Sequence, residues 1–274
     1  MKGIISLFYR GTAIVAISGL ALAAACHKSN KTEVEDSSYA TDYSTAEKTF
    51  NDVQTVSDQA ATVSGTLAYR TTATTGSGCA TVTHTFNGTD SIMTIDFGST
   101  NCLCHDGSYR RGQIIVTYSG HYADSGSVHN VTFNNFFHND NQVKGTKTVT
   151  NMGHNSLGQI YFNVTINGSI VKANGETHTA IWNRVRTWIT QGTPNVYQIT
   201  GSGTLVRPNG KTVGVNITSP LIVASNCRWI EAGTIVHTLP SGLTRTVNYG
   251  TTPACDNEAV ITLPNGTSRT ITLP

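Results

Sequence analysis

The residues best suited to chemistry in this sequence are its cysteines, its histidines and one strand-like run that carries tryptophan and arginine. The 274 residues include six cysteines and nine histidines. A cysteine can carry a lipid, form a disulfide or bind a metal ion, and a neutral histidine is a common metal ligand. The sequence around each of them indicates which of these roles is available.

Cys26 ends a segment that has the order of a bacterial export signal. Lys2 and Arg10 charge its first part, residues 12–22 form an apolar core, and Ala-Ala-Ala-Cys follows. Such a core is shorter than the ~20 residues that a membrane-spanning helix needs. The end of the segment resembles the lipobox of bacterial lipoproteins, so we predict a signal peptide over residues 1–25 and a lipid on Cys26. The alternative is an ordinary signal peptide with a chance cysteine.

The cysteines after Cys26 would lie in an oxidising compartment, which favours disulfides. The sequence alone does not fix the connectivity, and the pairing we expect is one bond between Cys227 and Cys255 and a second from Cys79 to one of two closely spaced partners. The odd number leaves one thiol unpaired or bonded to another molecule. The disulfide candidates are Cys79, Cys102, Cys104, Cys227 and Cys255, with Cys102 and Cys104 as the alternative partners of Cys79.

Two combinations of residues could hold a metal ion, but neither has a convincing ligand set. Cys102, Cys104 and His105 could bind zinc, although zinc sites usually have two or more residues between their cysteines. His121 and His129 flank a short loop, and in a symmetric hairpin they would face each other. The simpler interpretation is a pair of exposed histidines beside a turn. We therefore predict no metal and no cofactor.

The run 177–190 places an unusual set of side chains on one face of a strand. Alternation puts Trp182, Arg184, Arg186 and Trp188 together and sends apolar side chains to the other face. Indole rings beside guanidinium donors could stack on a sugar ring or hold an acidic polymer, so the four residues form a candidate ligand face. The favoured interpretation is structural, because arginine commonly covers aromatic rings through cation–π contacts.

The rest of the sequence argues against a recognisable enzyme and against a nucleic-acid partner. It contains no G-x-S-x-G, H-E-x-x-H, P-loop or dinucleotide fingerprint. The formal net charge is +2 and only 12% of the residues are charged, which is too little charge for a nucleic-acid interface. We therefore assign no catalytic residue.

Two segments precede the strand-forming part of the chain. Residues 26–43 comprise the lipid-bearing cysteine and a polar stretch without apolar periodicity, which predicts a flexible tether. Residues 45–60 carry apolar side chains at helical spacing, and Ser44 with Glu47 forms a capping box. This helix lacks the basic face of membrane-surface helices, so we expect it to pack on a sheet.

From residue 66 onward the pattern predicts strands joined by tight turns. Asn-Gly pairs between the runs suit type I′ hairpin turns, because both residues tolerate a positive φ. Asn167-Gly168 falls inside one long run and predicts a β-bulge. The strand-like runs are 66–72, 80–86, 91–97, 113–122, 128–138, 143–150, 160–173, 177–190, 196–206, 212–218, 221–224, 234–239, 244–249, 259–263 and 268–273.

Hairpins between sequence neighbours predict an antiparallel meander rather than parallel βαβ units. A sheet with one wet face and one buried face must curl or fold on itself to bury the latter. We therefore predict an all-β fold, in which a meander of long strands is curled into a two-layer sheet or an open barrel with one short N-terminal helix. Residues 44–274 would form a single β-rich domain.

Four segments of the exported part carry a resemblance to a known family. They are Ile95–Gly120, Val143–Gly153, Asn226–Thr234 and Thr244–Asp256. In this order they resemble a group of uncharacterised β-rich lipoproteins of Bacteroidota. The resemblance implies attachment to the outer membrane through Cys26, and it implies no activity and no catalytic residue.

Together these features favour a lipid-anchored envelope protein that is a non-enzymatic binding or structural β-module. Its partners would be the membrane, through the lipid, and a glycan or an envelope protein bound along the sheet. Both the periplasmic and the surface side of the outer membrane remain open. The first alternative is a carrier of lipid or lipoprotein with an apolar cavity. The second is a hydrolase whose serine, histidine and acid come from distant loops.

Overall fold

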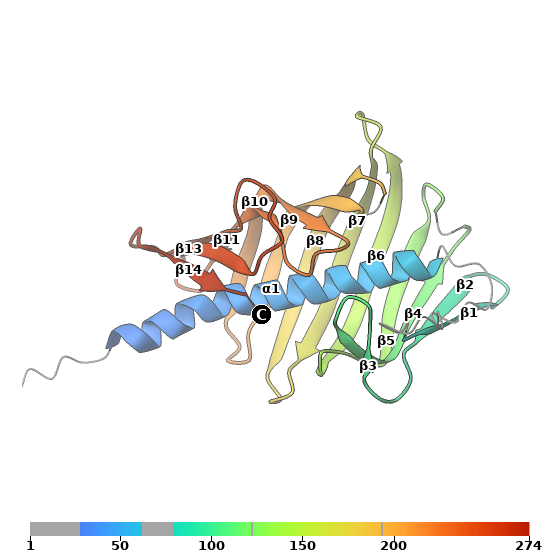
Figure 1. Ribbon diagram of the computed structural model, residues 1–274, viewed down its shortest axis with the longest axis horizontal. Coiled ribbons are helices and arrows are strands. Elements are labelled where there is room, and N and C mark those ends of the chain that lie inside the picture. The colour runs from blue at the N-terminus through green and yellow to red at the C-terminus, as the bar shows by residue number, and fades with distance from the viewer. Residues whose placement is uncertain (1–27, 62–78, 122, 193, 274) are drawn as a thin grey trace, which may run out of the picture.

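The computed structural model describes residues 28–61, 79–121, 123–192 and 194–273, with side chains from residue 37 onward. One helix, α1 (Lys28–Ala61), and a large antiparallel sheet make up this part of the chain (Figure 1). The strands are β1 (Thr81–Phe86), β2 (Ser91–Asp96), β3 (Cys102–Leu103), β4 (Tyr109–Tyr118), β5 (Val128–His138), β6 (Asn141–His154), β7 (Ile160–Val171), β8 (Thr177–Thr190), β9 (Val196–Val206), β10 (Thr212–Ala224), β11 (Ala232–Thr238), β12 (Thr244–Asn248), β13 (Glu258–Thr262) and β14 (Ser268–Thr272).

The predicted all-β fold with an antiparallel meander is confirmed. In the described part of the chain each strand pairs with its sequence neighbour, except that β2 pairs with β4 and the short β3 pairs beside it on β4. The sheet is curled but not closed into a barrel, because β1 and β14 do not pair with each other. The runs 212–218 and 221–224 are parts of the single strand β10, and the run 66–72 lies outside the described residues.

The hairpins use the predicted Asn-Gly pairs with a different turn geometry. The glycines of the four pairs have φ between +75° and +96°, whereas their asparagines do not adopt a positive φ. Between β7 and β8, the Gly175 N–H donates to the Lys172 carbonyl at 2.9 Å and the Lys172 N–H donates to the Glu176 carbonyl at 2.8 Å. These are longer loops in which only the glycine is left-handed, so the type I′ prediction was wrong.

Helix α1 is much longer than the predicted helix 45–60. It begins at Lys28, so most of the segment 26–43, which we predicted to be a flexible tether, is helical. Ser44 is not an N-cap but lies within the helix, where its hydroxyl is 2.9 Å from that of Tyr249. The capping-box pattern therefore did not mark the beginning of the helix.

The added length of α1 has a packing reason. Tyr39, Ala40 and Tyr43 continue the helical spacing of apolar residues backward, and all three are buried. Tyr39 forms a small apolar cluster with Val213 of β10 and Leu239, which follows β11. Burial of such a stripe against a sheet stabilises a helix that its own polar sequence would not predict.

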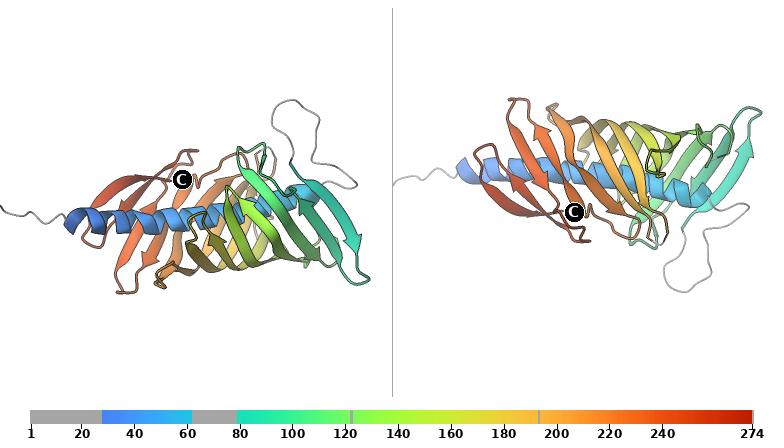
Figure 2. Two further views of the ribbon diagram at one scale, coloured as in Figure 1. Left: turned by 90° about the horizontal axis from the view of Figure 1, so that it is seen from below. Right: turned by 90° about the horizontal axis from the view of Figure 1, so that it is seen from above.

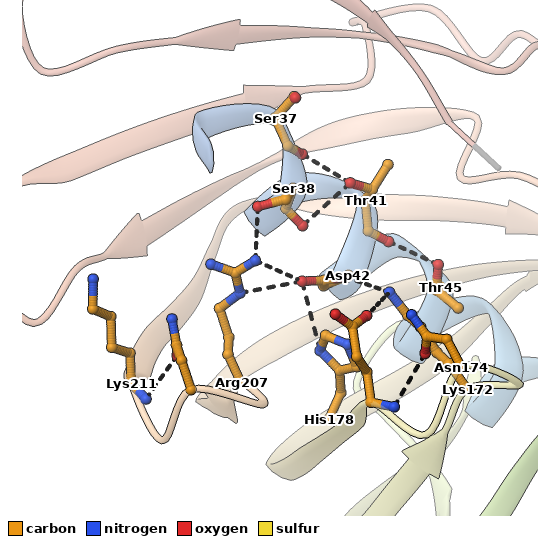
Figure 3. A network of polar contacts seen from close by, with 12 residues as sticks. Ser37, Ser38, Thr41, Asp42, Thr45, Lys172, Asn174, His178, Arg207 and Lys211 are labelled. Carbon is orange, nitrogen blue, oxygen red and sulfur yellow. Dashed lines mark hydrogen bonds and ion pairs between the residues drawn. The ribbon is translucent and has the colours of Figure 1, made fainter. Parts of the chain in front are cut away.

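A network around Asp42 holds the same part of α1 on the sheet (Figure 3). The buried Asp42 carboxylate accepts hydrogen bonds from Lys172 Nζ at 2.8 Å and from Arg207 Nε at 3.1 Å. His178 Nδ1 of β8 lies 3.6 Å from the same carboxylate, and Arg207 also donates to Ser38 Oγ at 2.7 Å. The polar residues that suggested a tether thus include one that is paired with residues from several strand ends.

Helix α1 lies inside the curled sheet, from the side of β13 and β14 to the side of β1 and β2 (Figure 1). In the two views of Figure 2 it passes in front of some strands and behind others, so the sheet wraps around it. Phe50 of α1 packs against Gly168 of β7, where an added Cβ would lie 2.6 Å from the phenyl Cζ. Asn167 and Gly168 pair in regular register with both neighbouring strands, so the bulge prediction was wrong. The glycine instead permits close approach of the helix.

Both predicted disulfides form. Cys227 is bonded to Cys255, and of the two alternatives for Cys79 the structure contains the bond to Cys102. Cys104 is the free cysteine among the described residues. The signal segment and Cys26 lie outside the described residues. Within them, no helix combines the length and the apolar character needed to span a membrane.

The contact between Phe50 and Gly168 generates a stability prediction. We expect Gly168→Ala to lower the free energy of unfolding by about 1–3 kcal/mol, because the new methyl group overpacks the helix–sheet contact. Gly214→Ala is the matched control, since there the nearest atom is a side-chain carbon of Thr238 at 3.3 Å. Chemical denaturation of both variants measures the difference. Equal stabilities would contradict the proposed role of Gly168.

His237 of β11 generates a prediction for the pH dependence of stability. It is buried beneath α1, its ring centroid lies 5.3 Å from that of Tyr43, and neither ring nitrogen has a hydrogen-bond partner in the described structure. Burial, together with the charge of Arg245, lowers the pKa of His237 to about 4. At pH values between the ordinary histidine pKa and about 4, His237 is therefore protonated in the unfolded chain but neutral in the folded one.

Stability should consequently fall as the pH drops from about 6.5 to 4, and His237 should contribute about 3 kcal/mol of that loss. Denaturation curves of the wild type and of His237→Leu across this range measure the contribution. The substitution also changes packing and hence the stability at neutral pH, so the slope of stability against pH is the readout. Parallel pH profiles for the two proteins would show that His237 does not carry this effect.

Candidate functional site

The candidate ligand face of β8 assembles as alternation predicted, but it faces α1. Trp182, Arg184 and Arg186 are buried, and Trp188 is partly buried against the core. On the opposite face of the strand, Ile181 is 47% exposed. Alternation defines two faces of a strand but not which one is covered, and the face with the arginines is covered by the helix. It is therefore not an accessible surface for a glycan.

The buried arginines of β8 pair with carboxylates of α1. Arg184 Nη2 lies 3.4 Å from Glu47 Oε2, and Arg186 Nη1 lies 3.3 Å from Asp58 Oδ2. The Arg184 guanidinium also lies over the Trp182 ring, 4.8 Å from its centroid. The favoured structural interpretation of this face, arginine side chains covering aromatic rings, agrees with these contacts.

Sequence reasoning missed a buried lysine in the same interface. Lys147 of β6 is 2% exposed, and its Nζ donates a hydrogen bond to the Phe50 carbonyl of α1 at 2.7 Å. Burial, with the nearby charge of Arg186, lowers the pKa of Lys147 to about 7. The signal was present in the alternation of β6, which places Lys147 on the same face as the buried Val143 and Val149.

Neither weak metal candidate forms a site. His129 is buried in β5 with its Nε2 3.0 Å from Ser127 Oγ, whereas His121 is exposed in the preceding loop. In the strand pairing His129 lies opposite Tyr118, not opposite His121. Cys102 is consumed by a disulfide, so it cannot serve as a thiolate ligand of zinc beside Cys104.

One cluster in the described residues does bring three metal-ligating atoms within 4.8 Å of one another. It consists of Cys227, Glu231 and Cys255. The two cysteines are bonded to each other, so the cluster offers a single carboxylate as long as the disulfide is intact. The bond is a covalent link between the β10–β11 and β12–β13 connections and not a metal site.

The feature best suited to bind a ligand is a pocket of about 660 Å³ beside the C-terminal half of α1. The first strands and the β10–β11 connection meet there, so residues more than a hundred positions apart in the sequence line one space. No local pattern in the sequence indicated it. Its lining includes Lys48, Asp52, Val56 and Ala60 of α1, Cys79, Ile95, Phe97, Cys104, His105, Asp106, Ser108, Arg110 and His138 of the first half of the sheet, and Val223, Cys227, Arg228, Trp229, Ile230 and Cys255 of the second.

Arg110 organises the polar end of this pocket. Its Nε donates to Asp52 Oδ2 at 3.0 Å, and a second bond joins Nη2 to the other oxygen of Asp52. Nη1 and Nη2 donate to the two oxygens of Asp106 at 2.9 and 2.6 Å. Burial alone would raise the pKa of Asp106, but Arg110 outweighs it and holds that pKa far below the usual range. The arginine thus links α1 to the β3–β4 loop through two carboxylates, each of which accepts two of its hydrogen bonds.

The polar groups of the pocket do not form a nucleophilic constellation. His138 Nε2 lies 3.6 Å from Asp52, whereas Ser108 interacts with Asp106, so this serine and this histidine contact different carboxylates. Burial raises the pKa of the Cys104 thiol, which keeps it protonated and poorly nucleophilic near neutral pH. Among the described residues the geometry of this pocket suits binding better than covalent catalysis.

Comparison with known proteins adds no family to these observations. Searches with the chain found no matching protein-family model, no matching curated protein and no matching solved structure. The resemblance to lipoproteins of Bacteroidota therefore stays a prediction from the residues that carry it. The lining and the volume of the pocket beside α1 are the features that bear on function.

Proposed function

We propose that the protein is a non-enzymatic binding module of the cell envelope, anchored to the outer membrane by a lipid on Cys26, which takes a small and largely apolar ligand into the pocket beside α1. The observation that carries this proposal is the pocket itself. Its volume of about 660 Å³ lies in the range of sites that enclose small molecules. A carrier that passes its ligand on would use the same pocket.

The character of the pocket wall favours an apolar ligand. Val56, Ile95, Phe97, Val223 and Ile230 line the space, and Asp52 and Asp106 bind Arg110 at its polar end. Sites for small molecules typically combine a mainly apolar wall with a few polar groups that orient the ligand. By contrast, the tryptophans and arginines of β8 are occupied by α1, so a glycan bound along that face is not part of the proposal.

The two disulfides support an extracytoplasmic location. Cys79–Cys102 and Cys227–Cys255 close loops with sequence separations of 23 and 28 residues. Structural disulfides of this kind persist in oxidising compartments and are rare in the cytosol. This agrees with export through the predicted signal peptide of residues 1–25, and it leaves both sides of the outer membrane open.

Filling the pocket tests the proposed binding site. We expect the wild type to bind the apolar fluorophore 1-N-phenylnaphthylamine at one saturable site, and Val56→Trp to weaken that binding about tenfold or more by occupying the space. Leu243→Trp adds the same side chain at a position that is 54% exposed and outside the pocket, so it should bind like the wild type. Fluorescence titration gives the affinities.

Cys104 supplies a second readout of the same prediction, because its thiol lines the pocket. In a full-length Cys26→Ser chain at alkaline pH, where more of the thiol is ionised, alkylation of Cys104 by iodoacetamide should slow when the fluorophore is bound. If Val56→Trp keeps both the wild-type affinity and its native fold by circular dichroism, the pocket is not the binding site. Unprotected labelling of Cys104 at saturating fluorophore would lead to the same conclusion.

The lipid anchor is tested separately. We expect the wild-type protein, expressed in its envelope, to partition into the detergent phase of Triton X-114 and to incorporate labelled palmitate. Cys26→Ser should lose both properties, because the thiol that accepts the lipid is gone. Retention of label and of detergent partitioning by the variant would rule out lipidation at Cys26.

A further inference from the structure

Two cationic side chains, one on α1 and one on a strand connection, contribute to the pocket beside α1. Lys48 of α1 and Arg228 of the β10–β11 connection both line it. In the described structure neither side chain takes part in an ion pair, although the Arg228 guanidinium lies 5.1 Å from the centroid of the Trp229 ring. Two such groups beside an apolar wall can together hold an anion.

Two carboxylates of the pocket, Asp52 and Asp106, are both hydrogen-bonded to Arg110. Both oxygens of Asp52 and both oxygens of Asp106 accept hydrogen bonds from Arg110. Arg110 thus binds two carboxylates with one positive charge, so this cluster keeps one net negative charge beside Lys48. Asp52 and Asp106 act on Lys48 at longer range, where they oppose the lowering of its pKa, and in the described structure they form no ion pair with it.

The surroundings of Lys48 disfavour its charged form. Its side chain is half-buried, and burial is the main cause that lowers its pKa. The charge of Arg228 is the next cause and acts in the same direction, ahead of the opposing effects of Asp52 and Asp106. An anion between the two cations would relieve their repulsion and compensate for the loss of hydration of Lys48.

The apolar wall of the pocket favours a different kind of ligand group. Val56, Ile95, Phe97, Val223 and Ile230 are apolar and line the same space as the two cations. A wholly polar anion would leave this wall without a partner, and a neutral hydrocarbon would leave the cations without one. A ligand that satisfies both has an anionic head and an apolar chain.

We propose that the pocket binds a single-chain anionic amphiphile with a carboxylate head, held between Lys48 and Arg228, and with its hydrocarbon chain against the apolar wall. This inference rests on the proposed function, because it names the ligand class of the same pocket. Arginine and lysine both donate charge-assisted hydrogen bonds to carboxylates, and Arg228 is free to do so from the exposed rim.

The experiment compares three ligands that share a ten-carbon chain and differ in the head group. Decanoate, decan-1-ol and decylamine are titrated against the complex of the full-length protein with 1-N-phenylnaphthylamine, and displacement gives each affinity. We expect decanoate to bind about tenfold more tightly than decan-1-ol, and decylamine to bind most weakly. Binding independent of the head group would overturn the proposal.

Matched variants assign the preference to the two cations. Lys48→Gln/Arg228→Gln should bind decanoate and decan-1-ol with similar affinity, because the neutral head never used the charges. Lys144→Gln/Lys211→Gln is the control, since it removes the same net charge from two exposed residues outside the pocket. Arg228→Gln alone changes an exposed side chain, so it should fold normally and lose part of the preference.

The outcomes separate this proposal from the one on which it rests. If the fluorophore binds, Val56→Trp blocks it and the three amphiphiles compete equally, the pocket is a binding site but its ligand is not selected by charge. If a preference for decanoate survives in Lys48→Gln/Arg228→Gln, other groups hold the head and the assignment is wrong. If Val56→Trp leaves fluorophore binding unchanged, the proposed function itself fails.

Discussion

The structure depends on α1 lying inside the curled sheet. A large sheet that is not closed into a barrel has a concave face, and that face must be covered to be stable in water. The helix provides the cover along its length, with Tyr43, Phe50 and Val53 fully buried beneath the strands. The strands wrap around it in both views of Figure 2, so the sheet and the helix form one core.

This core is unusual in that much of its helix–sheet contact is ionic. Burying charges is costly unless each one meets an opposite charge in good geometry. Four carboxylates of α1 do so at different strands or strand ends, and a shifted or rotated helix would leave several of them buried without partners. These pairs therefore specify the position of the helix even where they add little net stability. The pairings are Asp42 with Lys172 and Arg207, Glu47 with Arg184, Asp52 with Arg110, and Asp58 with Arg186.

The pocket arises from the same curl. Curling brings the β10–β11 connection close to the first strands and to the last turns of α1, so Trp229 and Cys104 line one space. At its polar end Arg110 ties the helix to the β3–β4 loop, and next to it Cys102 is covalently joined to Cys79. The walls of the pocket thus come from a helix, a disulfide-linked loop and a strand connection.

Much of the fold was predictable from the sequence, whereas the candidate site was not. Period-2 alternation and Asn-Gly pairs are local signals, so they predicted most strands, the meander and the hairpin positions. The number of cysteines predicted disulfides, but it did not fix their connectivity, and the choice between Cys102 and Cys104 stayed open. The length of α1 and the regular pairing at Gly168 were missed, because each depends on a partner distant in the sequence.

The sequence by itself determined which residues share a strand and which side chains share a face. Only the tertiary structure decided which face is covered, because the covering element is remote: Glu47 and the Arg184 that it contacts are 137 positions apart. For the same reason Trp182 and its neighbours became core residues and not a ligand surface. The pocket, whose walls come from both ends of the chain, exists only once the sheet has curled around the helix.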